Sequence, residues 1–107
     1  MTLDVYRTTT AFPPEEAFGL TRQSRRSARS IGANLAESCG RGSDRDFARF
    51  VQVALGSASE LEYHVLLAYD LGFVSTADQE RLLVSIAETK RMLTGLFRRL
   101  TKSTHRS

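Results

Sequence analysis

The sequence predicts an all-α fold, an antiparallel up-down four-helix bundle with a shortened first helix. Both prolines, Pro13 and Pro14, lie near the N-terminus, so nothing after them forbids long helices. Apolar residues recur every three or four positions in three long segments, without strand-like alternation. Turn glycines and Ser-x-x-Asp cap patterns separate these segments. A chain of 107 residues makes one domain, which we expect to be a bundle over 1–102 with a frayed basic tail at 103–107.

The first helix should occupy about two to three turns within residues 1–12, where apolar residues lie at helical spacing. Pro13 ends it, because the residue before a proline is pushed out of the α region. Pro14 and the two acids after it begin a further helical turn. Thr21 is the expected N-cap of the second helix.

The second helix has a narrow apolar face made of small residues, which are Ser24, Ala28, Ile31, Leu35 and Cys39. Beside that face lies a stripe of arginines at positions i, i+3, i+4 and i+7, namely Arg22, Arg25, Arg26 and Arg29. Gly40 and Gly42 should end the helix in the manner of a C′ glycine. Cys39 is the only cysteine, which excludes an intramolecular disulfide, and we expect it to be a small buried residue near the helix end.

The third helix should begin at a cap formed by Ser43 and Asp46 and run to about Leu71. Its core row is Phe47, Phe50, Val51, Ala54, Ala58, Leu61, Val65 and Ala68. Further apolar residues flank this row on both sides in the second half of the helix. A helix apolar on three sides is not at the edge of a monomer, so we expect a homo-oligomer that buries it further.

The fourth helix should follow the stop at Gly72 and begin at a cap formed by Ser75 and Asp78. Its expected inner face is Leu82, Ile86, Thr89, Leu93, Leu96, Phe97 and Leu100. No acid follows Glu88, while six basic residues do. Basic residues near a helix C-terminus suit the helix dipole, so part of this run requires no ligand.

The charge balance leaves two interpretations open. The net charge is +3, and the chain has 13 arginines against 2 lysines. Arginine makes bidentate contacts with phosphates and carboxylates, which favours a phosphate-rich or acidic partner. A coding bias that places arginines on a solvated face gives the same composition. No leader and no apolar run of transmembrane length is found, so the sequence predicts a cytoplasmic protein without a membrane partner.

For catalysis the residues offer little, and we expect neither an enzyme, nor a cofactor, nor a metal site. Glu60 and His64 lie four apart, whereas a bundle di-metal site needs Glu-x-x-His on two helices. A pairing of Cys39 with His64 lacks a third, orienting group. The turn Gly40-Arg41-Gly42-Ser43 is too short for a P-loop, although it can hold one phosphate at a helix N-terminus; a plain turn is the preferred interpretation.

The candidate nucleic-acid contacts are Arg22, Arg25, Arg26, Arg29, Arg41, Arg45 and Arg49. Without a helix-turn-helix pattern or an aromatic platform, contacts with DNA or RNA should be to phosphates and sequence-independent. The alternative pairs some of these arginines with Glu37, Glu60 and Glu62. A separate expectation is a polar network that closes the turn between the second and third helices, made by Asn34, Glu37, Gly40 and Arg41.

A long ordered set of residues resembles the four-helix-bundle family first noted in 23S ribosomal RNA intervening sequences. The resemblance covers about two thirds of the chain. It is carried by Phe12-Pro13, Glu16, Phe18-Gly19-Leu20-Thr21, Gln23, Arg25-Arg26, Ser30-Ile31, Asn34-Leu35-Ala36-Glu37, Gly40-Arg41, Phe47, Phe50, Ala54, Gly56-Ser57 and Glu60-Leu61. The resemblance implies an up-down bundle that assembles as a ring-like homopentamer. The family includes the accessory protein of diversity-generating retroelements, which implies nucleic acid and a reverse transcriptase as partners.

The chain departs from the family pattern at two places. Ser38 replaces a usual glycine, which should let the second helix run slightly further. The first helix is shorter than in the family. Either the start codon is misassigned, or the protein has a shortened first helix that leaves an apolar groove open to a neighbouring molecule. The sequence thus predicts a non-enzymatic oligomeric scaffold that binds nucleic acid or a nucleic-acid enzyme. The alternative is a purely structural ring or protein adaptor, and the direction of the arginine stripe distinguishes the two.

Overall fold

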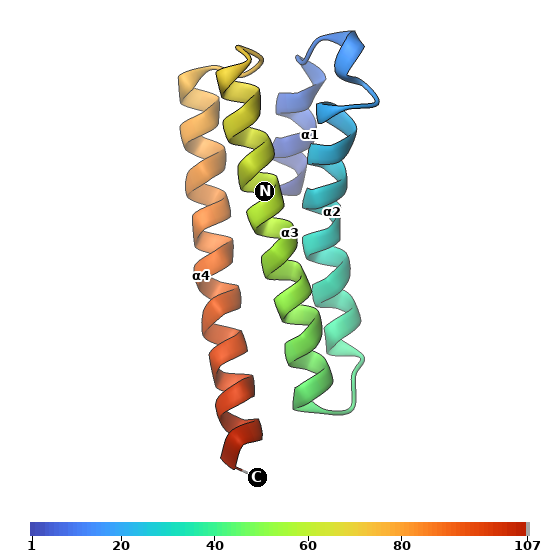
Figure 1. The fold of residues 1–107 in the computed structure, drawn as a ribbon, viewed down its shortest axis with the longest axis vertical. Helices are drawn as coiled ribbons and strands as arrows, with labels where there is room; N and C mark the ends of the chain where they lie inside the picture. The colour runs from blue at the N-terminus through green and yellow to red at the C-terminus, as the bar shows by residue number, and fades with distance from the viewer. Residues whose placement is uncertain (107) are drawn as a thin grey trace.

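The computed structural model is an all-α four-helix bundle measuring 51 × 22 × 17 Å. It describes the backbone of residues 1–106 and the side chains of residues 1–102, and the last helix continues to Arg106, past the start of the frayed tail that was predicted at 103–107. In chain order the elements are α1 (Thr2–Thr10), a 3₁₀ turn η1 (Pro14–Glu16), α2 (Leu20–Cys39), α3 (Asp44–Asp70) and α4 (Thr76–Arg106). Successive helices run in opposite directions (Figure 1). No helix in the described part of the chain combines the length and the apolar character that crossing a membrane requires.

α3 is the central helix, which packs along α2 on one side and along α4 on the other. Its fully buried residues include Val51, Ala54, Ala58 and Leu61 of the predicted core row. Phe47 and Phe50 of that row are only half-buried, and Ala48 is buried in their place. The main core joins these to residues of the other helices, which are Val5, Ala28, Ile31, Leu82, Ile86 and Leu93. Small residues on α2 and α3 let the two helices approach closely, and the longer side chains of α4 fill the opposite side.

The short α1 covers only the upper half of the bundle, beside α2 and α4 (Figure 1). In the lower half three helices form the core alone. Hydrophobic side chains there are only half-buried, and they include Leu35, Phe47, Leu96, Phe97 and Leu100. The half-burial of these side chains follows from the shortness of α1, which does not reach far enough to cover them.

α1 is fixed to α4 by one arginine. Arg81 donates from Nε and Nη2 to the two carboxylate oxygens of Asp4, each at 2.8 Å. Its Nη1 donates to Asp78 on its own helix at 2.6 Å. The hydrogen bond from Arg81 holds the pKa of Asp4 below its usual value. A bidentate pair of this kind sets orientation as well as proximity, so it fixes how α1 lies on α4.

The predicted N-terminal caps of α3 and α4 and the predicted end of α3 are confirmed. The Ser43 Oγ accepts a hydrogen bond from the Asp46 N–H at 3.2 Å, and the Ser75 Oγ accepts one from the Asp78 N–H at 3.1 Å. α3 ends at a left-handed glycine, Gly72, whose φ is +79°. The N–H of Phe73 then bonds to the Ala68 carbonyl at 2.9 Å, which completes a Schellman motif.

The predicted start of α2 is wrong, and its end falls at Gly40 as predicted but with a different turn geometry. The helix begins at Leu20 with Gly19 as N-cap, rather than after Thr21. The Glu16 Oε2 reaches over from η1 and accepts a hydrogen bond from the Leu20 N–H at 3.2 Å, so a carboxylate satisfies the first free backbone donor of the helix. At the other end Gly40 has φ −88° and is not left-handed. Its N–H closes a tight turn onto the Glu37 carbonyl at 3.2 Å instead.

Cys39 is exposed, and the prediction that it is buried is wrong. Its neighbour Ser38 takes the buried position, and the Ser38 Oγ donates to the Leu35 carbonyl at 2.6 Å. A hydroxyl can be buried here because it satisfies its own hydrogen bond within the helix. Steps of three and of four residues both keep a helical face, so spacing alone did not distinguish the two positions.

Candidate nucleic-acid interface

The arginine stripe of α2 divides into one inward and three outward side chains. Arg25 lies against α1, where its Nε donates to the Thr9 Oγ1 at 2.9 Å and its Nη2 donates to the Tyr6 carbonyl at 3.2 Å. Its guanidinium also lies 4.7 Å from the centre of the Tyr6 ring. Arg25 therefore leaves the predicted set of nucleic-acid contacts, because its charge is used to fix α1 on α2.

Helix geometry explains the division. Successive residues of an α-helix are about 100° apart around the axis, so Arg25 and Arg26 mark opposite edges of the stripe. The edge with Arg25 faces the hydroxyls and carbonyls of α1. The edge with Arg26 faces solvent.

The outward arginines, Arg22, Arg26 and Arg29, are exposed. None of the three has a hydrogen bond, ion pair or ring contact with another described residue. Together with Phe18 and Gln23 they line an open hollow on the outer side of α2. We call this set the outer arginine site. It presents three guanidinium groups along a surface about 10 Å long, the rise of seven helical residues.

The carboxylates that could neutralise this site have other partners. Glu37 pairs with Arg41 at the lower turn. Glu60 lies 3.3 Å from the Nε2 of His64, and Glu62 lies 3.5 Å from the Nζ of Lys90 on α4. Within one chain, the alternative prediction that these three acids pair with the arginines is thus met only at Glu37, and pairing between bundles stays a prediction. The first turn of α2 also contains no acid.

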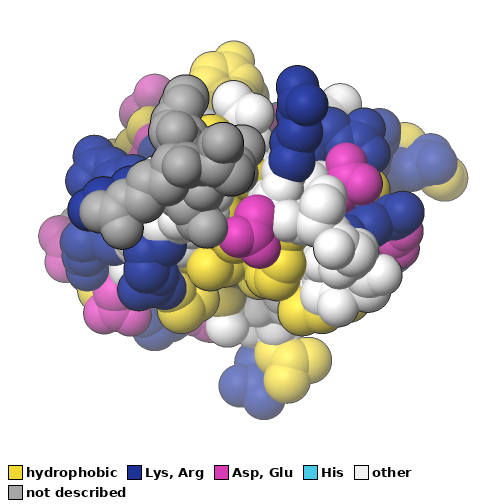
Figure 2. Space-filling view, turned by 90° about the horizontal axis from the view of Figure 1, so that it is seen from below, with side chains coloured by type: hydrophobic (Ala, Val, Ile, Leu, Met, Phe, Trp, Pro, Cys, Tyr) yellow, Lys and Arg dark blue, Asp and Glu magenta, His cyan; other side chains and the backbone are white. Residues whose placement is uncertain are grey.

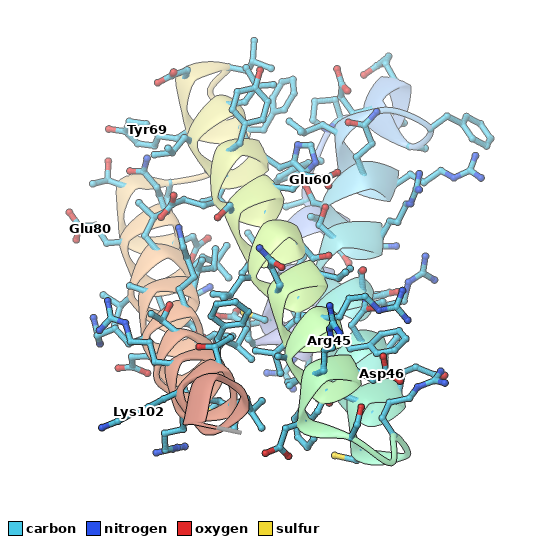
Figure 3. The ribbon with its side chains drawn as sticks, turned by 60° about the horizontal axis from the view of Figure 1, so that its bottom comes forward. Arg45, Asp46, Glu60, Tyr69, Glu80 and Lys102 are labelled. Carbon is cyan, nitrogen blue, oxygen red and sulfur yellow. The ribbon has the colours of Figure 1, made fainter. Side chains whose placement is uncertain are left out.

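The second group of predicted contacts is Arg41, Arg45 and Arg49, at the lower end of the bundle. Arg41 and Arg49 lie over the Phe50 ring. The guanidinium carbon of Arg41 is 4.7 Å from the ring centre, and that of Arg49 is 4.9 Å from it. Arg45 and Asp46 lie in the first turn of α3, at the same end as Lys102 of α4 (Figure 3). Seen from below, this end has basic side chains around its rim with acidic and hydrophobic ones between them (Figure 2).

The two arginine groups are separate. Arg29 lies ten residues before the end of α2 at Cys39, which is about 15 Å along the helix axis, and Arg41 lies in the turn beyond that end. Arg41 is already paired and stacked, and Arg45 has acids next to it in the chain. The lower group therefore has more of its positive charge paired with, or placed next to, acids than the outer arginine site has.

The residues of the predicted polar network at the turn between α2 and α3 form two separate groups. Arg41 and Glu37 form an ion pair, as expected. Asn34 lies higher, where its Nδ2 donates to the Ser30 carbonyl at 2.8 Å and to the Ser30 Oγ at 3.1 Å. Ser30 in turn lies 2.8 Å from the Ser57 Oγ on α3. Asn34 thus supports the contact between two helices rather than the turn, and Gly40 contributes only backbone.

No catalytic arrangement forms around His64. The ring is buried; its Nε2 faces Glu60, which lies on the α2 side of α3 (Figure 3), and its Nδ1 has no partner. The contact of Ser30 with Ser57 sets the register of the two helices, so Cys39 lies roughly 24 Å along the bundle from His64. A thiol–imidazole pair is therefore ruled out by distance. In the described residues no group of three or more His, Cys, Asp or Glu could hold a metal ion.

One residue of the outer arginine site was missed. Phe18 is 85% exposed on the turn before α2, next to the arginines. The sequence offered one hint: Phe18 lies outside the apolar row that begins at Leu20 and Ser24.

Comparisons with known proteins agree with this architecture. A crystal structure of a protein of unknown function from the S23 ribosomal protein family, from Bacteroides thetaiotaomicron, superposes with a TM-score of 0.79. It is 25% identical and covers 90% of this chain and 87% of its own. No curated protein matches the chain. The model of the 23S rRNA-intervening sequence protein family matches residues 1–95, and the chain therefore belongs to that family.

Proposed function

We propose that this protein is a non-enzymatic, homo-oligomeric helical scaffold that binds nucleic acid through the outer arginine site. The observation that supports the proposal is the state of Arg22, Arg26 and Arg29, which are exposed, adjacent and without an acceptor in the described chain. Guanidinium groups bind phosphate oxygens in a bidentate manner and are always charged. Three of them on one surface repel one another and attract a polyanion.

Contacts of this type are made to phosphates, so binding is sequence-independent and falls steeply with salt. Repetition of the site by an oligomer multiplies its effect, because one nucleic-acid strand that reaches several copies binds them at high effective concentration.

The oligomer has support of its own on the outer face of α3. Large hydrophobic side chains are exposed there in the single chain, with Val53 at 49%, Tyr63 at 61% and Leu66 at 42%. Gly56 and Ser59 lie between them and are also exposed, which gives a face that another helix can approach closely. We propose that this face is buried between subunits, in the pentamer that the family resemblance implies.

A second candidate function is a purely structural ring or protein adaptor. It is favoured by the structural use of Arg25, Arg41 and Arg49, which are held by α1, Glu37 and Phe50. In this alternative the outer arginines face a neighbouring subunit or another protein rather than phosphates.

The test is the triple variant Arg22→Ser, Arg26→Ser, Arg29→Ser. Binding to a fluorescein-labelled 20-nucleotide strand is measured by anisotropy at several NaCl concentrations. Since each neutralised phosphate contributes about 0.7 to the salt slope on a single strand, the slope should fall by about 2. The affinity at low salt should fall by at least about tenfold, with an unchanged melting temperature and mass.

The matched control is Arg91→Ser, Arg98→Ser, Arg99→Ser, three exposed arginines of α4 with the same total charge change. It should bind more tightly than the outer-site triple. Equal losses in the two triples would show that only net charge matters and would contradict the outer arginine site. Loss of the oligomer in the outer-site triple, seen by light scattering, would place these arginines at a subunit contact and support the second candidate.

A further inference from the structure

Phe18 protrudes from a well-ordered turn. The Ala17 N–H donates to the Pro14 carbonyl at 3.1 Å, and the Gly19 N–H donates to the Glu16 carbonyl at 3.0 Å. The Gln23 N–H then donates to the Gly19 carbonyl at 3.0 Å, so the turn continues directly into α2. Backbone hydrogen bonds on both sides thus hold Phe18 in place, although its ring is 85% exposed and contributes little to the core.

The ring lies in line with the outer arginines. Phe18, Arg22, Arg26 and Arg29 follow one another at steps of four, four and three residues, and they line the same hollow with Gln23. From Arg22 to Arg29 the helix rises about 10 Å, and Phe18 lies on the turn just before the helix begins at Leu20. An aromatic ring therefore stands at the end of a row of unpaired guanidinium groups.

We infer that the outer arginine site is built for single-stranded nucleic acid, with one base stacked on Phe18 and the following phosphates on Arg22, Arg26 and Arg29. The inference rests on the proposed function and specifies its substrate class. Proteins that bind single strands combine a basic track for the backbone with aromatic side chains on which bases stack. Stacking is tolerant of sequence, because every base has a π-face.

A duplex can contact the arginines of this site through its phosphates, but it cannot readily stack a base on Phe18. Its bases are paired and stacked on one another, so Phe18 can reach a base face only by wedging into the stack and kinking the DNA, which requires energy. An acidic protein surface would engage the guanidinium groups as well, but it offers no planar ring at the regular spacing of a nucleotide chain. The Gln23 amide adds a donor and an acceptor for the edge of an exposed base.

The experiment compares Phe18→Ala with the wild-type protein on three fluorescein-labelled ligands. These are a 20-nucleotide oligothymidylate, an abasic phosphodiester of the same length and charge, and a 20-base-pair duplex. The wild type should prefer oligothymidylate to the abasic strand by about tenfold, and Phe18→Ala should remove that preference without changing the salt slope. Phe18→Trp should retain it. Tyr69→Ala, which removes an exposed aromatic at the C-terminal end of α3 that hydrogen-bonds with Thr76 of α4, is the matched control and should bind as the wild type does.

The outcomes separate this inference from the proposed function. If Phe18→Ala binds oligothymidylate as tightly as the wild type while the outer-site arginine triple is weakened, phosphate binding stands and the stacking role is refuted. If the arginine triple binds normally too, the proposed function fails as well. Binding to the duplex that equals or exceeds binding to the single strand overturns the inference, as does a change of oligomeric mass in Phe18→Ala.

Discussion

The two sides of α2 use the same residue type for opposite purposes. On the side of α1, Arg25 donates to a threonine hydroxyl and a backbone carbonyl and lies over a tyrosine ring. On the outer side, Arg22, Arg26 and Arg29 contact no described acceptor. Arg25 stabilises the packing of α1 on α2, whereas the three outer arginines repel one another and stabilise no contact between helices. The comparison shows that the role of an arginine here depends on whether a facing helix supplies acceptors.

The outer side is not arranged for stability. Arg22 lies in the first turn of α2, where the helix dipole favours an acid, and it is followed by two further arginines at i+4 and i+7. Like charges at i, i+4 destabilise a helix by a few tenths of a kcal/mol. Residues that weaken the fold locally are most simply explained by a task outside it. The contrast leads to three stability predictions, given from the largest effect to the smallest.

Replacing the inner arginine should produce the largest loss. Arg25→Ala removes hydrogen bonds from a charged donor to α1, so unfolding in urea should show a decrease of about 1 to 3 kcal/mol. Arg26→Ala, one residue away on the outer side, should stay within about 0.5 kcal/mol of the wild type. Equal effects of the two substitutions would mean that the two sides of α2 do not differ in the way described.

The attachment of α1 to α4 should show a smaller effect that depends on pH. Since Arg81 lowers the pKa of Asp4 in the folded state, the pair contributes stability above the ordinary value of 3.8 and loses it as the pH falls through the lowered value. At pH 7, Asp4→Asn should lower the melting temperature by about 2 to 4 °C. At pH 3 the wild type and the variant should melt closer together. Glu88→Gln, on the exposed face of α4, serves as the control and should show no such convergence.

Reversing a charge on the outer side should have the smallest effect, in the opposite direction. Arg22→Glu places an acid in the first turn of α2 and an i, i+4 ion pair with Arg26, so it should raise stability by about 0.3 to 1 kcal/mol at low salt. In 0.5 M NaCl the gain should fade, because exposed charges are screened. A loss of stability at low salt would reveal a structural contact of Arg22 and would remove it from the outer arginine site.

Much of the fold could be predicted because the interactions that begin and end its helices are local in the sequence. The caps at Ser43 and Ser75 and the left-handed Gly72 are satisfied by residues within a few positions, so the sequence pattern contains the whole interaction. Cys39 was placed wrongly because its burial depends on which of two adjacent positions faces α3. That choice is made by packing between helices, and spacing within one helix does not determine it.

The candidate site could be predicted only in part, for the same reason. The stripe of four arginines follows from periodicity, but the inward turn of Arg25 depends on the position of α1, which no repeat in the sequence specifies. The exposure of Phe18 depends on how the turn after η1 is oriented. Both are properties of how elements meet, and they decide which residues of the stripe are free to bind.

The attachment of α1 also bears on the order in which the chain folds. α2, α3 and α4 are joined by short turns, so their contacts have low contact order and close small loops. The short α1 packs mainly on α2, and its bond to α4, between Asp4 and Arg81, joins residues 77 positions apart and can form only once α4 is in place. We therefore expect the three long helices to form the folding nucleus and α1 to dock onto them late. A helix of nine residues that docks last is also the element with the lowest local unfolding free energy, so the amide protons of α1 should exchange with solvent before those of the nucleus.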